Sequence, residues 1–161
     1  GEGRARVVLV GSRLEKRAEL DVEALVASRG AALRAGAGAG AFDPMLHYAD
    51  TKRANMLLAL ALHDRWQREG AGIDVLTVTP GMVDTNLWGN FPLWYRTLTK
   101  PVRWAFLRTA EEAAAGVVYA AAAEEAEGLS GLYLGDGRPV EPSAGARDAA
   151  AAERLYRLCD E

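Results

Sequence analysis

The residues Ala5-Arg-Val-Val-Leu-Val10, followed directly by Gly11-Ser12, are the stretch from which the fold can be worked out. A short run rich in β-branched residues predicts a buried strand of a parallel sheet, and the Gly-Ser pair predicts a turn at its end. A second run of this kind, Ile73-Asp-Val-Leu-Thr-Val78, is closed by Pro80-Gly81. A third and shorter strand is expected over Leu132–Leu134.

Helical patterns occupy the sequence between and after these strands. From Ala49 to about Glu69 apolar residues recur at helical spacing, and Gly70 follows where the pattern stops. Thr109-Ala-Glu-Glu112 is a capping box and predicts a helix that continues to about Glu127. Two further helices are expected, a short one around Val22–Ser28 and a final one over Ala146–Asp160.

The alternation of strands and helices predicts an α/β layer fold with a parallel sheet. A length of 161 residues suits one domain with its own core and is too short for two. Three strands are few for such a sheet. We therefore expect this chain to be a fragment, with further strands upstream of Gly1.

Composition and charge limit the classes of function. A net charge of -3, spread without a basic block, argues against nucleic acid as a partner. The single cysteine, Cys159, allows no disulfide within the chain, and with only His47 and His63 beside it we expect no metal site. The longest apolar run, Met56–Leu62, is too short to span a bilayer, and no signal peptide is expected.

The segment Tyr48-Ala-Asp-Thr-Lys52 opens the long predicted helix and carries a candidate acid/base pair. A spacing of four residues puts the phenol and the ammonium on one helix face, one turn apart. A nearby cation lowers the pKa of a tyrosine from its ordinary value near ~10, which makes the phenol a usable general acid/base. Because the chain contains five tyrosines, such a pair could also arise by chance.

Two turns at strand ends supply further candidate groups. Ligands of parallel sheets gather at the carboxyl ends of the strands, so the Ser12 hydroxyl could reach a substrate oxygen there. Pro80-Gly81-Met-Val83-Asp-Thr85 would hang over the same end of the sheet. The alternatives are that Ser12 only caps a turn and that Pro80-Gly81 is only a turn. The glycines of Gly36-Ala-Gly38-Ala-Gly40 predict a flexible surface insertion, because no strand precedes them directly as a phosphate loop requires.

Taken together, these segments resemble the catalytic half of the short-chain dehydrogenases/reductases, and more narrowly their retinol-dehydrogenase-like branch. The residues that carry the resemblance are Ser12, Tyr48-x-x-x-Lys52, Lys52-Arg-Ala-Asn55, Pro80-Gly81-x-Val83-x-Thr85, the acidic-hydrophobic stretch Glu19–Leu25, the turn Leu129-Ser-Gly-Leu-Tyr133 and the closing helix. The resemblance implies the C-terminal half of one Rossmann-type, doubly wound domain. Its expected parts are a strand with the catalytic serine (1–12), a loop and insertion (13–47), the catalytic helix (48–70), a strand with the Pro-Gly loop (73–86), a substrate lid (87–108), and C-terminal helices and a strand (109–161).

The resemblance also implies residue roles. Tyr48 would pass a proton to or from the substrate oxygen, Ser12 would hold that oxygen by a hydrogen bond, and Lys52 would lower the pKa of Tyr48. Tyr48 and Lys52 would also contact a nicotinamide cofactor, Lys52 at its ribose. The nicotinamide would be lined by Pro80, Gly81, Val83 and Thr85. The implied activity interconverts an alcohol and a carbonyl with NAD(P)(H), and NADP is slightly favoured over NAD.

Residues 87–108 hold a dense set of aromatic and basic side chains, among them Trp88, Phe91 and Trp94. In the family this region forms a substrate lid, which implies a small lipophilic substrate such as a retinoid, a sterol, or a long-chain alcohol or aldehyde. An aromatic and basic surface also suits peripheral contact with a membrane, as at the endoplasmic reticulum or a lipid droplet. The alternative to a lid is a plain packed helix pair. The alternative to membrane contact is a cytoplasmic location.

The chain departs from the family pattern in what it lacks. The glycine-rich cofactor loop, the residue that selects NAD or NADP and the helix asparagine of the family's tetrad are missing, and we expect them upstream of Gly1. A non-catalytic fragment acting as an interaction or regulatory module is therefore an alternative, and so is a sugar epimerase or dehydratase that shares Tyr48 and Lys52. A homodimer formed through the helix that bears Tyr48 and the helix before it is a further expectation from the family.

Overall fold

Four strands form one sheet in the computed structural model, which describes residues 4–27, 43–83 and 107–160. Their order along the sheet is β1 (Ala5–Val10), β2 (Ile73–Thr79), β3 (Tyr133–Gly135) and β4 (Arg138–Pro139). The first three strands run parallel, and β4 pairs antiparallel to β3. The predicted α/β class with a mainly parallel sheet is confirmed. The fourth strand was not expected, because two residues show no periodicity of their own.

Strand β1 lies at the edge of this sheet and pairs only with β2, from Ala5 opposite Ile73 to Val10 opposite Val78. Its residues are half-buried or exposed, whereas Asp74–Thr79 of the central strand are all buried. The expectation of a buried strand over Ala5–Val10 is therefore wrong, since in the described sheet this edge strand has a neighbouring strand on one side only.

The longest helix, α3 (Pro44–Glu69), starts earlier than the apolar periodicity predicted. The Asp43 carboxylate accepts hydrogen bonds from the backbone amides of Met45 and Leu46, and Pro44 occupies the first turn. An aspartate cap followed by proline is a strong start signal, and it adds a turn before Tyr48. The predicted end is confirmed: Gly70 closes the helix in the left-handed conformation, with φ of 63°.

The remaining helices also begin at side-chain caps. The predicted capping box is present at the start of α5 (Ala110–Ala122), where Thr109 and Glu112 bond each other's backbone amides. The helix ends before the predicted Glu127, and a short 3-10 turn, η3 (Glu124–Ala126), follows it. Helix α6 (Ala149–Asp160) begins three residues later than predicted, because Asp148 accepts from the amides of Ala150 and Ala151 and another 3-10 turn, η4 (Gly145–Arg147), precedes it.

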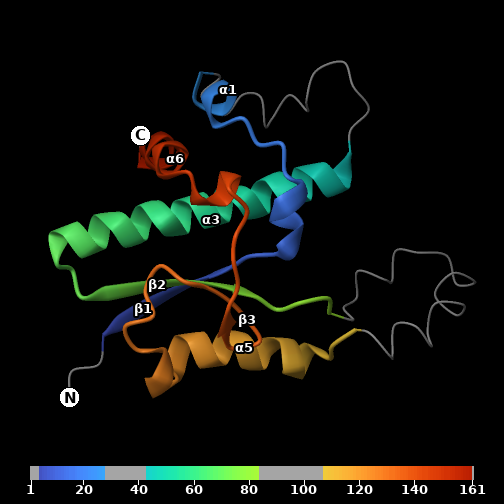
Figure 1. Ribbon diagram of the computed structural model, residues 1–161, viewed down its shortest axis with the longest axis vertical. Helices are drawn as coiled ribbons and strands as arrows, with labels where there is room; N and C mark the ends of the chain where they lie inside the picture. Colours follow the sequence, from blue (N-terminus) through green and yellow to red (C-terminus); the bar gives the residue numbers. More distant parts are fainter. Residues whose placement is uncertain (1–3, 28–42, 84–106, 161) are drawn as a thin grey trace, which may run out of the picture.

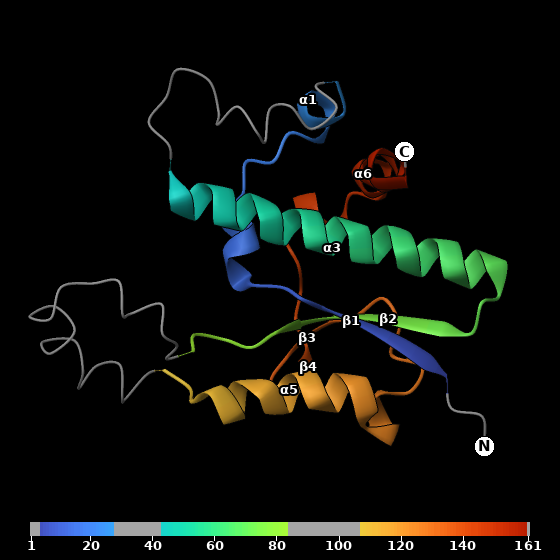
Figure 2. The same ribbon diagram turned by 180° about the vertical axis from the view of Figure 1, so that it is seen from behind.

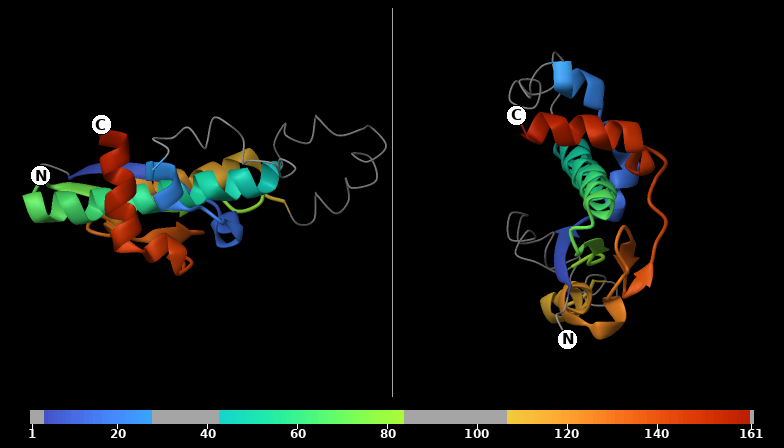
Figure 3. Two further views of the ribbon diagram at one scale, coloured as in Figure 1. Left: turned by 90° about the horizontal axis from the view of Figure 1, so that it is seen from above. Right: turned by 90° about the vertical axis from the view of Figure 1, so that its left-hand side faces the viewer.

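The helices build layers on both faces of the sheet (Figures 1 and 2). Helix α5 covers one face, where Ala120 packs with Leu76, Val78 and Leu134. Helix α3 covers the opposite face. The short helix α1 (Val22–Ala27) and α6 lie on the side of α3 that is turned away from the sheet, and α6 crosses over α3 (Figure 3).

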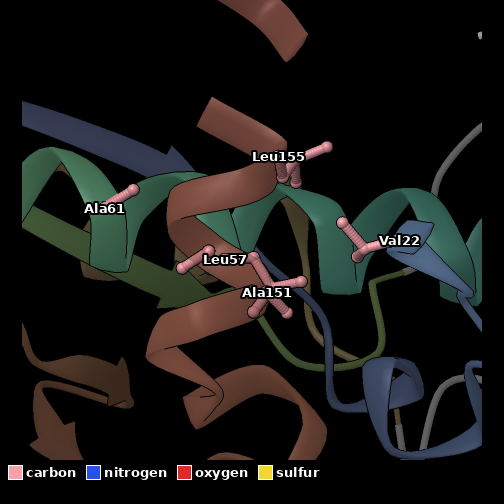
Figure 4. Close-up of a cluster of buried hydrophobic side chains, with 6 residues drawn as sticks. Val22, Leu57, Ala61, Ala151 and Leu155 are labelled. Carbon is pink, nitrogen blue, oxygen red and sulfur yellow. The ribbon is translucent and has the colours of Figure 1, made fainter. Parts of the chain in front are cut away.

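A second core therefore lies outside the sheet, between α3 and α6. Leu57 and Ala61 of α3 pack there against Leu155 of α6, and Val22 of α1 joins them (Figure 4). Helix α3 is thus enclosed between the sheet and α6, which fixes the orientation of the helix that carries Tyr48 and Lys52.

Candidate active site

Tyr48 and Lys52 lie on the second and third turns of α3, close to the carboxyl end of β1. The ammonium of Lys52 donates a hydrogen bond to the backbone carbonyl of Val10 at 3.0 Å. The same nitrogen lies 5.4 Å from the centre of the Tyr48 ring. Tyr48 is 43% exposed, so its phenol is accessible to a small molecule. The arrangement puts one fixed cation between a tyrosine and a strand end.

Ser12 follows β1 after Gly11 and begins a 3-10 turn, η1 (Arg13–Arg17). Its hydroxyl oxygen accepts a hydrogen bond from the amide of Leu14 at 3.3 Å, as the capping alternative predicted. Accepting uses only a lone pair, and the hydroxyl proton can still be donated to a ligand. Capping and substrate contact are therefore compatible roles for Ser12.

The turn that holds Ser12 is tied to the first turns of α3 by two further contacts. The carboxylate of Asp50 accepts from the amide of Glu19 at 2.8 Å, and the guanidinium of Arg53 donates to the carbonyl of Glu15 at 2.8 Å. Asp50 and Arg53 flank Lys52 in the sequence. These contacts consequently fix the position of the segment after β1 relative to the helical turn that carries Tyr48 and Lys52.

Gly11 is required by the close approach of neighbouring side chains rather than by a turn. Its amide donates to the carbonyl of Val78 at 2.8 Å. A Cβ at this position would lie 2.9 Å from Cγ2 of Thr77 and 3.3 Å from the ring of Tyr133. Any larger residue would push the end of β1, and Ser12 with it, away from the rest of the sheet.

Tyr133, the first residue of β3 in the same sheet, is almost fully buried, and its ring would lie 3.3 Å from a Cβ at Gly11. Burial raises the pKa of its phenol, and the neighbouring charge of Glu15 acts in the same direction. The charge of Arg13 opposes the rise. Tyr133 is therefore a buried phenol near the end of β1, whereas Tyr48 is accessible.

The Pro-Gly loop follows β2 at the same end of the sheet. Gly81 adopts a left-handed φ of 78°. Val83 pairs with Arg108 in an isolated parallel bridge, and the amide of Arg108 donates to the carbonyl of Met82 at 2.9 Å. These contacts bring together the two segments that flank residues 84–106 in the sequence.

Arg108 is a residue of this loop whose position no sequence pattern indicated. A Cβ at Gly81 would lie 3.5 Å from Cδ of Arg108, and the guanidinium forms an ion pair with Asp136. Asp136 follows β3 and itself has a positive φ of 57°. The Arg108–Asp136 pair thus links the loops that follow β2 and β3, which sequence spacing cannot reveal.

Several predicted site residues lie outside the described residues. They are Thr85, Trp88, Phe91 and Trp94, and the insertion predicted at the glycines of 36–40 also lies outside the described residues. The lid, the membrane contact through 87–108 and the role of Thr85 therefore stay predictions. Within the described ranges, no helix is long and apolar enough to cross a bilayer, and no three His, Cys, Asp or Glu side chains could hold a metal ion.

Comparison with known proteins identifies the family. Polyprenol dehydrogenase of Mus musculus is 35% identical to this chain over 156 residues, which cover 96% of the chain and 43% of the relative. Retinol dehydrogenase 14 of Homo sapiens is 30% identical over 158 residues, which cover 97% of the chain and 43% of the relative. Dehydrogenase/reductase SDR family member 13 of Homo sapiens is 35% identical and is covered to 38% of its length. The chain thus spans about two fifths of these relatives.

The fold has a counterpart among solved structures. A crystal structure of an uncharacterised protein from Mycobacterium paratuberculosis matches 98% of this chain with a TM-score of 0.64, at 24% identity, and the match covers 49% of that protein. No family model matches the sequence. The parallel strand order and the match to this solved structure show part of a Rossmann-type domain. The identities with the curated relatives show that the chain belongs to the short-chain dehydrogenase/reductase family, in its retinol dehydrogenase 14- and polyprenol dehydrogenase-like branch.

Proposed function

We propose that the protein containing this chain is an NAD(P)-dependent oxidoreductase that interconverts an alcohol and a carbonyl group. The observation that carries this proposal is the position of the Lys52 ammonium, 5.4 Å from the Tyr48 ring and 3.0 Å from the carbonyl that precedes Gly11-Ser12. A fixed cation beside an accessible phenol can stabilise the negative charge that forms on the phenol oxygen when the proton is transferred.

The residues at this strand end suit a nicotinamide nucleotide. A lysine ammonium has three donor hydrogens, and Val10 takes one, so two remain for the hydroxyls of a ribose. Pro80, Gly81 and Val83 would lie along the nicotinamide ring, and Gly81 presents backbone without a side chain there. Thr85 would complete this wall. NADP rather than NAD is the cofactor that we favour.

In the oxidation direction, Tyr48 and Ser12 act on the same substrate oxygen. The Ser12 hydroxyl donates a hydrogen bond to the alcohol oxygen, and the Tyr48 phenolate takes the hydroxyl proton. A nicotinamide cofactor held at this strand end would supply the acceptor for the hydride from the substrate carbon. The alcohol would thus lose a hydride to that acceptor and a proton to Tyr48, and its C–O bond would become C=O. The reduction reverses each transfer.

A lipophilic substrate is the second part of the proposal. Two of the relatives are named for retinol and polyprenol, which are both largely apolar alcohols. The aromatic residues Trp88, Phe91 and Trp94 would supply an apolar surface over the strand ends, as a lid. Peripheral contact with a membrane would bring the protein to such a substrate.

The test is Tyr48→Phe in the full-length protein, assayed with NADP⁺ or NAD⁺ and a long-chain alcohol. The change keeps the ring and removes only the transferable proton, so stability should change by no more than about 1 kcal/mol. Turnover should fall by roughly 10²–10⁴, as expected when a general acid/base is lost. A folded Tyr48→Phe protein that keeps more than a tenth of wild-type turnover would contradict the assignment.

A further inference from the structure

Glu15 is a fully buried carboxylate three residues after Ser12, at 0% exposure. Its two carboxylate oxygens accept hydrogen bonds from Ser143, one from the amide at 3.0 Å and one from the hydroxyl at 2.5 Å. Arg53 pairs with the carboxylate at 4.0 Å from its Nε. A buried carboxylate is costly unless it is paired and hydrogen-bonded, so this group is held by its partners in one place.

The backbone of Glu15 makes two more contacts, one on each side. Its amide donates to the carbonyl of Ser12 at 3.1 Å. Its carbonyl accepts from the Arg53 guanidinium at 2.8 Å, and Arg53 is the neighbour of Lys52 on α3. One residue therefore connects the serine turn, the helix of Tyr48 and Lys52, and the C-terminal segment, although Ser143 is 128 residues away in the sequence.

We propose that Glu15 is the positioning residue for Ser12, and that Ser143 anchors it from the C-terminal segment. The proposal rests on the function proposed above, in which the Ser12 hydroxyl holds the substrate oxygen. The turn η1 is five residues long, and 3-10 turns have poor hydrogen-bond geometry of their own. A catalytic group must stay within ~0.5 Å of its productive position, so the turn needs an external support.

If Glu15 acts through Ser12, its effect on catalysis must vanish when the Ser12 hydroxyl is absent. A purely structural role predicts instead that the two changes reduce turnover independently. The test is a cycle of Ser12→Ala, Glu15→Gln and the double variant in the full-length protein. The readouts are kcat, KM and the Kd of NADP⁺ measured by calorimetry.

We expect Glu15→Gln to lower kcat by about tenfold or more, within the range that misplacement of a reacting group causes, with KM and Kd changed less than about twofold. The double variant should have the kcat of Ser12→Ala alone. The proposal would be overturned if the effects of the two substitutions on kcat multiply in the double variant, or if Glu15→Gln leaves kcat unchanged. An unchanged kcat for Ser12→Ala would refute the role of Ser12 itself, which is a separate and distinguishable failure.

A second pair of variants covers the case in which Glu15→Gln does not fold. Ser143→Ala removes one hydroxyl from the Glu15 carboxylate and leaves the amide contact in place. Ser130→Ala is the matched control, since Ser130 is also half-buried and bonds His63 at 2.8 Å and the amide of Val75 at 2.9 Å, at the opposite end of the sheet. If the two variants lower Tm equally, Ser143→Ala should still lower kcat several times more than Ser130→Ala does. Equal losses of kcat would show that only stability is involved, and the proposal would fall.

Discussion

The ammonium of Lys52 donates to the carbonyl of Val10, the last residue of β1, across 42 residues of sequence. This single contact attaches the helix that carries Tyr48 to the strand end that leads into Ser12. It also leaves the ammonium beside the Tyr48 ring. Lys52 is thus a structural link, and in the function proposed above it is also the cation that assists Tyr48, so the two roles need to be separated by experiment.

Lys52→Met should abolish most activity and weaken the binding of NADP⁺, because the ammonium is lost and the aliphatic stem is kept. Tyr48→Phe should weaken cofactor binding far less, because it keeps the ring and leaves the Lys52 ammonium in place. Lys16→Met is the matched control, since Lys16 lies exposed on η1 and has no contact with Tyr48 among those observed. Lys52→Arg is a poor control because a guanidinium differs in shape and size. Calorimetry with equal NADP⁺ affinity for Lys52→Met and wild type would refute the cofactor contact.

Gly131→Ala should destabilise the fold more than Gly128→Ala. Both glycines have a positive φ, 83° and 77°, so both substitutions carry the left-handed strain of about 1–2 kcal/mol. A Cβ at Gly131 would also lie 2.8 Å from Nε2 of His63, whose ring Ser130 holds in place, whereas nothing lies within 4 Å at Gly128. The additional cost is about 1–3 kcal/mol. Urea unfolding measures both, and equal midpoints would show that the His63 ring moves freely.

Leu155→Ala tests the core outside the sheet. Leu155 is buried against Leu57 on the face of α3 that is turned away from the strands. Removing it should lower the free energy of unfolding by about 2–5 kcal/mol, as cavities in packed cores do. Arg157→Ala is the control on the same helix, because its exposed pair with Glu153 contributes no more than about 0.5 kcal/mol. Similar effects of the two changes in thermal or urea unfolding would mean that α6 does not pack on α3.

Stability should fall in alkaline solution because of Tyr133. Burial raises its pKa above the ordinary value of 10.0, so the folded chain holds the phenolic proton more tightly than the unfolded chain. The stabilisation is fully present below that ordinary value and is lost as the pH rises above it. Tyr133→Phe should therefore show a smaller drop in urea midpoint between about pH 9 and about pH 11. The same drop in both proteins would mean that other groups cause it.

The local signals in the sequence predicted most of the fold. The β-branched runs at Ala5–Val10 and Ile73–Val78, the capping box at Thr109 and the stop at Gly70 all specify their elements through neighbours within one turn or one strand. The spacing of Tyr48 and Lys52 is likewise a local property, because four residues make about one helical turn. These features needed no knowledge of what the segments pack against.

Contacts between distant segments were decided only by the tertiary structure. They include the bond from Lys52 to Val10, the close approach of Thr77 to Gly11, and the pair of Arg108 with Asp136. They also include the burial of Glu15 against Ser143. From the sequence, a charged residue such as Glu15 is expected at the surface, because a carboxylate is rarely buried without a partner. Its partner is supplied from the far end of the chain by the way α3, the sheet and the C-terminal segment pack together, and no periodicity or capping pattern encodes that packing.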